Sequence, residues 1–248
     1  MTRNALLVAH GQPSDPRPAG AALEGLAAKV QALLPGWQVA AATLAEPGAI
    51  ARAVAELAPG VVFPMFMAGG WFTRVQIPAR LTQAGATGWT VLEPFGCDPL
   101  LHDLCVTLIR EATAQSPGPC EVILAAHGSS KSDAPANVAR RAAHHVAAKT
   151  GAQVRTGFID QHPQLVGMTG FHADAICLPY FAAEGGHVSE DIPRALAAAG
   201  FQGRILPPVG ADPRVPEIIA KAILRGKPVC ISQCEAGREI DVHCGTNA

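Results

Sequence analysis

Short apolar segments alternate with longer segments of mixed polarity along most of the chain. In the first half, the apolar segments 5–9, 39–43, 61–66 and 90–92 predict strands. Segments rich in helix formers lie between and after them, at 19–34, 47–58, 77–84 and 99–115. Strands that alternate with helices at this spacing predict right-handed βαβ units and a parallel sheet.

The second half repeats this alternation. Its predicted strands are 122–126, 152–158, 175–178 and 204–206, and its predicted helices are 134–150, a short one within 163–171, 192–199 and 215–224. The segment SPGP at 116–119 is the predicted linker. We therefore predict one α/β domain over residues 1–117, a second over 118–226, and a cysteine-containing tail over 227–248.

Three sequence motifs occur twice in the same order. ALLVAHG at 5–11 returns as VILAAHG at 122–128, and EPFGCDP at 93–99 returns as PPVGADP at 207–213. The segment VVFPMFMAGGWFTRVQIP at 61–78 returns as AICLPYFAAEGGHVSEDIP at 175–193. Repeats spaced by about 115 residues indicate a tandem duplication of one α/β unit.

Composition narrows the class of protein. The 248 residues are 49% hydrophobic and 16% charged, which is typical of a globular protein with real cores. A net charge of −1 gives no general attraction to nucleic acid or to an anionic membrane. The sequence contains neither an apolar stretch of about 18 residues nor a signal-peptide pattern before residue 5. Seven scattered cysteines suggest reduced thiols, so we expect a cytoplasmic protein; the sequence leaves its oligomeric state open.

Two histidines follow predicted strands of the second half. His127 comes directly after the strand 122–126, and His187 lies in the glycine turn after the strand 175–178. Both rings should emerge at the carboxyl edge of the sheet, where open α/β sheets bind their ligands. A pair of neutral imidazoles can bind a divalent cation, accept protons, or do both. The alternative is that each histidine only hydrogen-bonds its own turn.

Carboxylates follow His187 closely. Glu184, Glu190 and Asp191 are candidates to relay protons or to pass a metal ion to the histidines, and we predict a catalytic role for Glu190. The alternative is that they favour the start of a helix that Ser189 caps, an interpretation at least as good for Asp191.

Other polar residues suggest contacts to an anionic substrate. Ser129 and Ser130 can hold a carboxylate together with exposed amides, or can cap a helix. Arg74, in the glycine turn of the first half, is a second candidate, and His10 corresponds to His127. Trp71 is assigned to the position that corresponds to His187, so only the second half keeps both histidines.

The remaining motifs carry weaker signals. No phosphate-binding glycine loop follows either first strand, which argues against nucleotide binding. The tail contains a possible soft-metal set whose spacing matches no common zinc pattern, so a mobile tail is the favoured interpretation; the set is Cys230, Cys234, His243 and Cys244.

Together, VAHG, AAHGSS and LPYFAAEGGHVSEDIP resemble the sirohydrochlorin chelatases of the CbiX/SirB type, in the class II chelatase group. The resemblance runs from about residue 5 to 224. It implies two flavodoxin-like domains that face each other across a cleft, and insertion of cobalt or iron into a modified tetrapyrrole without an organic cofactor. It also implies that His127 and His187 bind the metal and take protons from the pyrrole nitrogens. In many two-domain members of this type the complete pair lies in the first half.

The resemblance also implies what else the site must contain. A flat ring with many carboxylates needs an open apolar cleft and cationic anchors. Candidate anchors are Arg74, Lys131 and helix N-termini. The candidate apolar lining, of which several residues can instead belong to the core, is Met65, Phe66, Trp71, Phe72, Tyr180 and Phe181.

Two other hypotheses remain open. The first is a metal or tetrapyrrole carrier that does not turn over, suggested by Trp71 and the tail. The second is a different α/β enzyme that uses His127 as a base and does not need His187. The metal ligands alone do not distinguish cobalt from iron or nickel.

Overall fold

The structure is a computed structural model that describes residues 3–114 and 120–230. Each half contains a four-stranded sheet in which every strand pair is parallel. The elements of the first half are β1 (Arg3–Ala9), α1 (Pro16–Ala32), β2 (Trp37–Thr43), α2 (Ala49–Ala55), β3 (Val61–Pro64), α3 (Ile77–Gln83), β4 (Thr90–Val91) and α4 (Pro99–Thr113). Those of the second are β5 (Glu121–Ala126), α5 (Ala134–Thr150), β6 (Gln153–Phe158), β7 (Ile176–Pro179), α6 (Ile192–Ala198), β8 (Arg204–Ile205) and α7 (Val215–Arg225).

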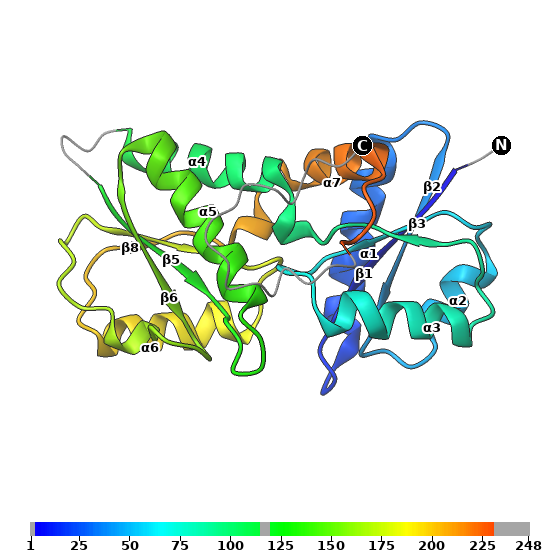
Figure 1. Ribbon diagram of the computed structural model, residues 1–248, viewed down its shortest axis with the longest axis horizontal. Coiled ribbons are helices and arrows are strands. Elements are labelled where there is room, and N and C mark those ends of the chain that lie inside the picture. The colour runs from blue at the N-terminus through cyan, green and yellow to red at the C-terminus, as the bar shows by residue number, and fades with distance from the viewer. Residues whose placement is uncertain (1–2, 115–119, 231–248) are drawn as a thin grey trace.

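The two sheets have the same strand order. The orders are β2-β1-β3-β4 and β6-β5-β7-β8, which match the first four strands of a flavodoxin-like sheet. This confirms the predicted pair of tandem α/β domains. The order reverses between β1 and β3, and between β5 and β7, and such a switch point is where these sheets bind ligands. The carboxyl ends of β1 and β5 both lie toward the middle of the molecule (Figure 1).

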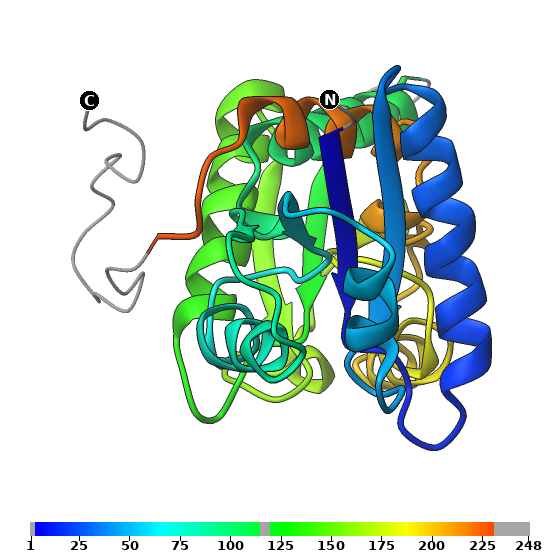
Figure 2. The same ribbon diagram turned by 90° about the vertical axis from the view of Figure 1, so that its right-hand side faces the viewer.

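Helices cover both faces of each sheet. Alternate residues of β1 enter two different clusters: Ala5 and Leu7 pack with α1, whereas Leu6 and Val8 pack with α2 and α3. Figure 2 shows α1 (blue) and α3 (cyan) on opposite sides of β1. Side chains of a strand point to alternate faces, so a strand covered on both faces must be apolar throughout.

The last helix of each half packs against the other half. α4 contacts α5 and β7, and α7 contacts α1 and β3, so the two helices are exchanged between the sheets (Figure 1). One cluster of buried side chains runs through α1, α4, α5 and α7. The two halves therefore share a continuous core.

The segment after α7 returns to the first sheet. Glu93 donates its backbone N–H to the carbonyl of Lys227 at 3.0 Å, and Val229 donates to the carbonyl of Val91 at 2.9 Å. Lys227 also forms an ion pair with Glu93, and Arg225 pairs with Asp98. The first residues of the predicted tail, 227–229, thus run antiparallel to residues 91–93 at the edge of the first sheet.

The structure refines one local prediction and overturns another. The short helix predicted within 163–171 is the 3₁₀-helix Leu165–Gly167, which ends because Met168 adopts a φ of −83° and a ψ of 81°, outside the helical region. Ser189 does not cap α6: it lies inside a π-helix, His187–Asp191, and its hydroxyl donates to the carbonyl of Gly185 at 3.2 Å. The linker 116–119, the boundary at 117 and the tail residues Cys234, His243 and Cys244 lie outside the described residues.

Candidate active site

His127 is fixed by the turn that ends β5. Gly128 follows it with a φ of 72°, and a Cβ at Gly128 would lie 2.7 Å from the Cβ of Gln161. Only glycine combines this backbone conformation with so close an approach. The His127 side chain, 44% exposed, therefore stands at the carboxyl end of β5.

His187 is fixed by a π-helix. The turn His187–Asp191 continues directly into α6, and Ser189 donates its backbone N–H to the carbonyl of Gly185 at 3.0 Å. Single π-helical turns inside longer helices are frequent at functional sites. The His187 side chain is 49% exposed.

The two predicted histidines meet. Their ring centroids are 4.6 Å apart and their planes are at 90°. His127 follows β5 and His187 follows the loop after β7, so the pair spans the switch point of the second sheet. Residues 60 positions apart in the chain therefore form one side-chain pair.

Hydrogen bonds decide which ring nitrogen each histidine offers. The Nδ1 of His127 lies 3.1 Å from the carbonyl oxygen of Gly128, and the Nδ1 of His187 lies 2.7 Å from a carboxylate oxygen of Asp191. Both partners only accept, so each Nδ1 carries the hydrogen and donates it. The lone pair of each neutral imidazole is then on Nε2, the nitrogen available to a metal ion.

Two carboxylates support the histidine pair. The hydrogen bond from His187 and the charge of Arg194 hold the pKa of Asp191 below its usual value. An oxygen of Asp160 lies 3.7 Å from the Nδ1 of His127. Carboxylates behind metal-binding histidines orient the rings and raise their basicity. The sequence offered Asp191 as a candidate, with stabilisation of a helix start as the alternative, whereas no pattern in the sequence pointed to Asp160.

Gln161 holds the loop that follows His127. Its Oε1 accepts the backbone N–H of Ser129 at 3.1 Å, and its Nε2 donates to Asp133 at 2.9 Å. The Ser129 hydroxyl in turn accepts the N–H of Lys131 at 3.1 Å. Gln161, in the loop after β6, therefore fixes the loop between His127 and α5. It belongs to no recognisable sequence motif.

The first half repeats the geometry with different chemistry. His10 and Phe72 have ring centroids 4.8 Å apart and planes at 89°, close to the values for His127 and His187. Phe72 begins the π-helix Phe72–Gln76, as His187 begins its own. Phe72 is thus the counterpart of His187, and the assignment of Trp71 to that position is wrong by one residue. The residues 61–78 align with 176–193 without a gap, a signal that the sequence already contained.

Both carboxylates are also missing from the first half. Ala45 corresponds to Asp160, because each donates its backbone N–H at 2.9 Å to the carbonyl of the histidine after the first strand. Gln76 corresponds to Asp191 in the gap-free alignment. His10 keeps the same Nδ1 contact, 2.9 Å to the carbonyl of Gly11, but the phenyl ring of Phe72 takes the place of the second imidazole.

The other predicted site residues are divided between the two halves. Glu190 is exposed within the π-helix of His187, and Ser130 is exposed in the loop after His127. Arg74 lies in the π-helix of Phe72, half-buried, and its Nε donates to the carbonyl of Cys230 at 3.0 Å. Of the candidate lining residues, Met65 and Tyr180 belong to the core, the alternative that the sequence left open, because they directly follow interior strands.

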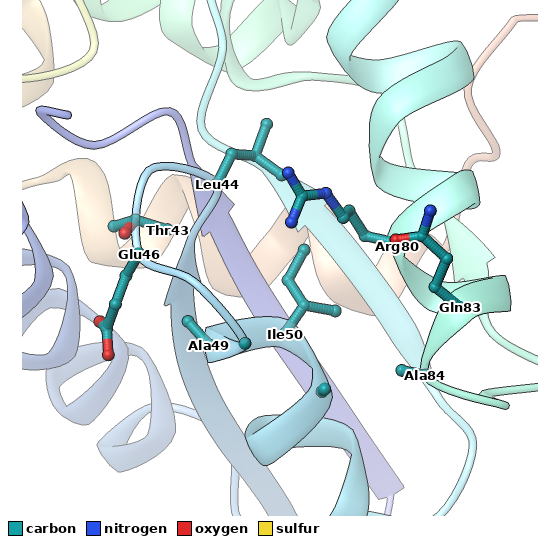
Figure 3. Close-up of a pocket in the computed structure, with 10 residues that line it drawn as sticks. Thr43, Leu44, Glu46, Ala49, Ile50, Arg80, Gln83 and Ala84 are labelled. Atoms are coloured by element: carbon teal, nitrogen blue, oxygen red, sulfur yellow. The ribbon is translucent and has the colours of Figure 1, made fainter.

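Two cavities lie elsewhere in the described part of the chain. One of about 230 Å³ lies between the end of β2, α2 and α3, where Arg80 extends across Ile50 toward Leu44 (Figure 3). The other, of about 180 Å³, lies beside Asp98 and Arg225. Neither is lined by a residue of the histidine pair.

Residues 3–114 and 120–230 contain no group of three or more His, Cys, Asp and Glu side chains arranged to hold a metal ion. None of their helices combines the length and apolarity needed to cross a membrane.

Comparison with known proteins identifies the family. The family model of CbiX matches residues 121–225, the half that carries the histidine pair. A solved structure described as CbiX, the terminal enzyme for biosynthesis of siroheme in denitrifying bacteria, is 45% identical to the chain. The match covers 90% of this chain and 99% of that one, with a TM-score of 0.83. The chain belongs to the CbiX family.

More distant structures share the CbiX fold. SirB from Bacillus subtilis with Fe³⁺ is 15% identical, with a TM-score of 0.69 over 91% of this chain and 96% of that one. The sirohydrochlorin chelatase SirB from Bacillus subtilis subspecies spizizenii, in complex with cobalt, is 14% identical, with a TM-score of 0.66 over 91% and 95%. No curated protein matches the chain.

Proposed function

We propose that this CbiX-family protein inserts a divalent metal ion, cobalt or iron, into sirohydrochlorin or a closely related tetrapyrrole. The observation that carries the proposal is the contact between His127 and His187, with ring centroids 4.6 Å apart. The 45% identical relative is described as an enzyme of siroheme biosynthesis, and the cobalt-bound relative as a sirohydrochlorin chelatase. Metal and tetrapyrrole are both substrates here.

The two Nε2 atoms hold the incoming ion. Imidazole nitrogen suits borderline divalent cations such as Co²⁺ and Fe²⁺. Two neutral ligands at an exposed site leave the other coordination positions to water, so the pyrrole nitrogens can replace the water and then the histidines. The carboxylate of Asp191, 2.7 Å from the Nδ1 of His187, keeps that ring in the tautomer that binds metal.

The same histidines receive the protons. Insertion breaks two pyrrole N–H bonds and forms bonds from the metal to the ring nitrogens, so two protons leave the tetrapyrrole for each ion that enters. As the ion departs, each Nε2 lone pair becomes free to take one proton. Asp191 and Asp160 stabilise the imidazolium ions that result, and Glu190 passes protons on to solvent.

The remaining predicted residues act on the tetrapyrrole. We assign contacts with its carboxylates to Ser129 and Ser130 on one side of the site and to His10 and Arg74 on the other. No organic cofactor is needed, because the reaction exchanges a metal ion for protons. Buried thiols such as Cys105 and Cys177 support a location in the reducing cytoplasm.

The test is a metal-insertion assay. Purified protein, sirohydrochlorin and Co²⁺ or Fe²⁺ are mixed, and the absorption spectrum of the tetrapyrrole is followed with time. We expect multiple turnovers, and we expect His127→Ala and His187→Ala each to lower kcat/KM at least about 100-fold, since each removes a metal ligand. His144→Ala, an exposed histidine on α5, is the matched control and should leave the rate unchanged.

The alternatives give different results. A carrier would bind metal or tetrapyrrole stoichiometrically and show no turnover. An enzyme of another kind that uses His127 as a base would retain most of its activity in His187→Ala. Either result would overturn the proposal.

A further inference from the structure

An aromatic cluster occupies the place in the first half where the second half has its histidine pair. Phe72 lies between two aromatic neighbours, Phe66 at 5.6 Å with nearly parallel planes and Trp71 at 5.1 Å edge-on. Trp71 is 58% exposed, whereas Trp37 and Trp89, the other two tryptophans, are half-buried. Because Trp71 contacts Phe72, which in turn contacts Phe66, its exposed indole belongs to a continuous aromatic cluster and is not a single scattered side chain.

The loop that carries Phe66, Trp71 and Phe72 and the loop that leads to His187 meet at one junction between the halves. The turn Phe95–Cys97 packs against the loop after β3 so closely that a Cβ at Gly96 would lie 2.0 Å from the carbonyl oxygen of Met67. The carbonyl of Gly96 accepts the hydroxyl of Tyr180 at 2.6 Å, and Tyr180 begins the loop that leads to His187. Trp71 is four residues from Met67, so the chain places it within about 14 Å of this junction.

The aromatic cluster is unsuited to metal chemistry. Phe72 offers no lone pair, and Ala45 and Gln76 replace the two carboxylates of the second half. Aromatic faces stack on flat conjugated rings and exclude water from them. The halves therefore provide two different surfaces, one of imidazoles and carboxylates and one of exposed aromatic rings.

We propose that Trp71, supported by Phe72 and Phe66, is the stacking platform on which the flat tetrapyrrole rests while the histidine pair of the second half delivers the metal. This inference rests on the proposed function and names the part of the site that binds the macrocycle. It makes Trp71 a substrate-positioning residue with no part in metal binding or proton transfer.

The experiment separates tetrapyrrole binding from metal handling. We expect Trp71→Ala to raise the KM for sirohydrochlorin roughly five- to tenfold, the loss of one aromatic stacking contact, with little change in kcat. Co²⁺ binding, measured by equilibrium dialysis without tetrapyrrole, should be unchanged. Trp71→Phe keeps an aromatic ring at this position, so its KM for sirohydrochlorin should stay close to the wild-type value. Leu224→Ala, an equally exposed apolar side chain on α7, is the matched control.

A second measurement does not require metal insertion. Sirohydrochlorin alone, titrated into the protein, should quench tryptophan fluorescence, and Trp71→Phe should bind equally well with most of the quenching lost. If the wild type binds sirohydrochlorin with quenching that Trp71→Phe loses, but never inserts metal, the proposed function fails and the platform stands. If it inserts metal while Trp71→Ala keeps the wild-type KM, or Leu224→Ala shows the same rise, the platform is refuted and the function stands. If the wild type binds no tetrapyrrole, both fail.

Discussion

Replacing Phe72 with histidine should create a second metal site in the first half. The phenyl ring of Phe72 stands 4.8 Å from His10 at 89°, and His127 and His187 stand 4.6 Å apart at 90°. His10 already donates from Nδ1 to the carbonyl of Gly11 at 2.9 Å, which leaves its Nε2 lone pair available. An imidazole in the place of the phenyl ring therefore completes a pair of the same geometry.

The new site should be weaker than the natural one by a predictable amount. Gln76 and Ala45 stand where the second half has Asp191 and Asp160, so the new pair lacks the two carboxylates that support the natural pair. Removal of such a partner commonly costs 10- to 100-fold in metal affinity. We expect Phe72→His to bind a second Co²⁺ about 10- to 100-fold more weakly than the first. Loss of the contact with Phe66 should cost about 1 kcal/mol of stability.

Isothermal titration with Co²⁺ measures this directly. The wild type should show one site, Phe72→His two sites of unequal affinity, and the double variant Phe72→His/Gln76→Asp a tighter second site. Phe72→Leu controls for the loss of the phenyl ring and should keep one site. A single site in a folded Phe72→His protein, with Co²⁺ raised several hundredfold above the first dissociation constant, would refute the equivalence of the two halves.

Three further predictions concern stability, measured by urea unfolding. Tyr180→Phe should cost about 1 kcal/mol, because the hydroxyl is lost while His102 still contacts the Gly96 carbonyl at 3.1 Å. Gly128→Ala should cost about 1–3 kcal/mol, since it forces a φ of 72° on a residue with a Cβ. Burial lowers the pKa of His102 from 6.5 to about 4. The folded state therefore resists protonation that the unfolded chain accepts. The stability from neutral His102 is complete above pH 6.5 and falls by about 3 kcal/mol as the pH drops to 4, and His102→Gln should lack this loss.

The sequence predicted the sheets and the histidine pair because both depend on local patterns. A buried strand of apolar residues ends at His127, and another ends just before the turn of His187. Parallel strands that are neighbours in a flavodoxin-like order bring their carboxyl ends together, so the pairing follows from the fold. The repeat also contains the equivalence of Phe72 and His187. It is found when the whole segments are aligned, whereas aligning only their paired glycines matches Trp71 with His187.

Other features depend on contacts that no local pattern specifies. Apolar periodicity shows that α4 and α7 each bury a face, but it does not show that each packs on the sheet of the other half. Asp160 and Gln161 lie in an irregular loop after β6, and only the folded chain brings them to His127 and Ser129. Asp191 lies four residues after His187, and the two side chains meet because a helical turn begins at His187, a start that the sequence does not mark.

The difference between the halves has an electrostatic reason if both face one macrocycle. With a tetrapyrrole bound between the halves, two divalent ions or two sets of protonated imidazoles would repel each other across a site from which water is excluded, whereas without tetrapyrrole water screens the two sites from each other. A ring that accepts one ion gains nothing from a second one opposite. With Phe72 in place of a histidine, the first half carries no second metal ion or imidazolium at this position. The Phe72 ring keeps the shape of the site and still packs edge-to-face with His10. The same backbone can therefore serve as a metal site in one half and as an uncharged wall in the other.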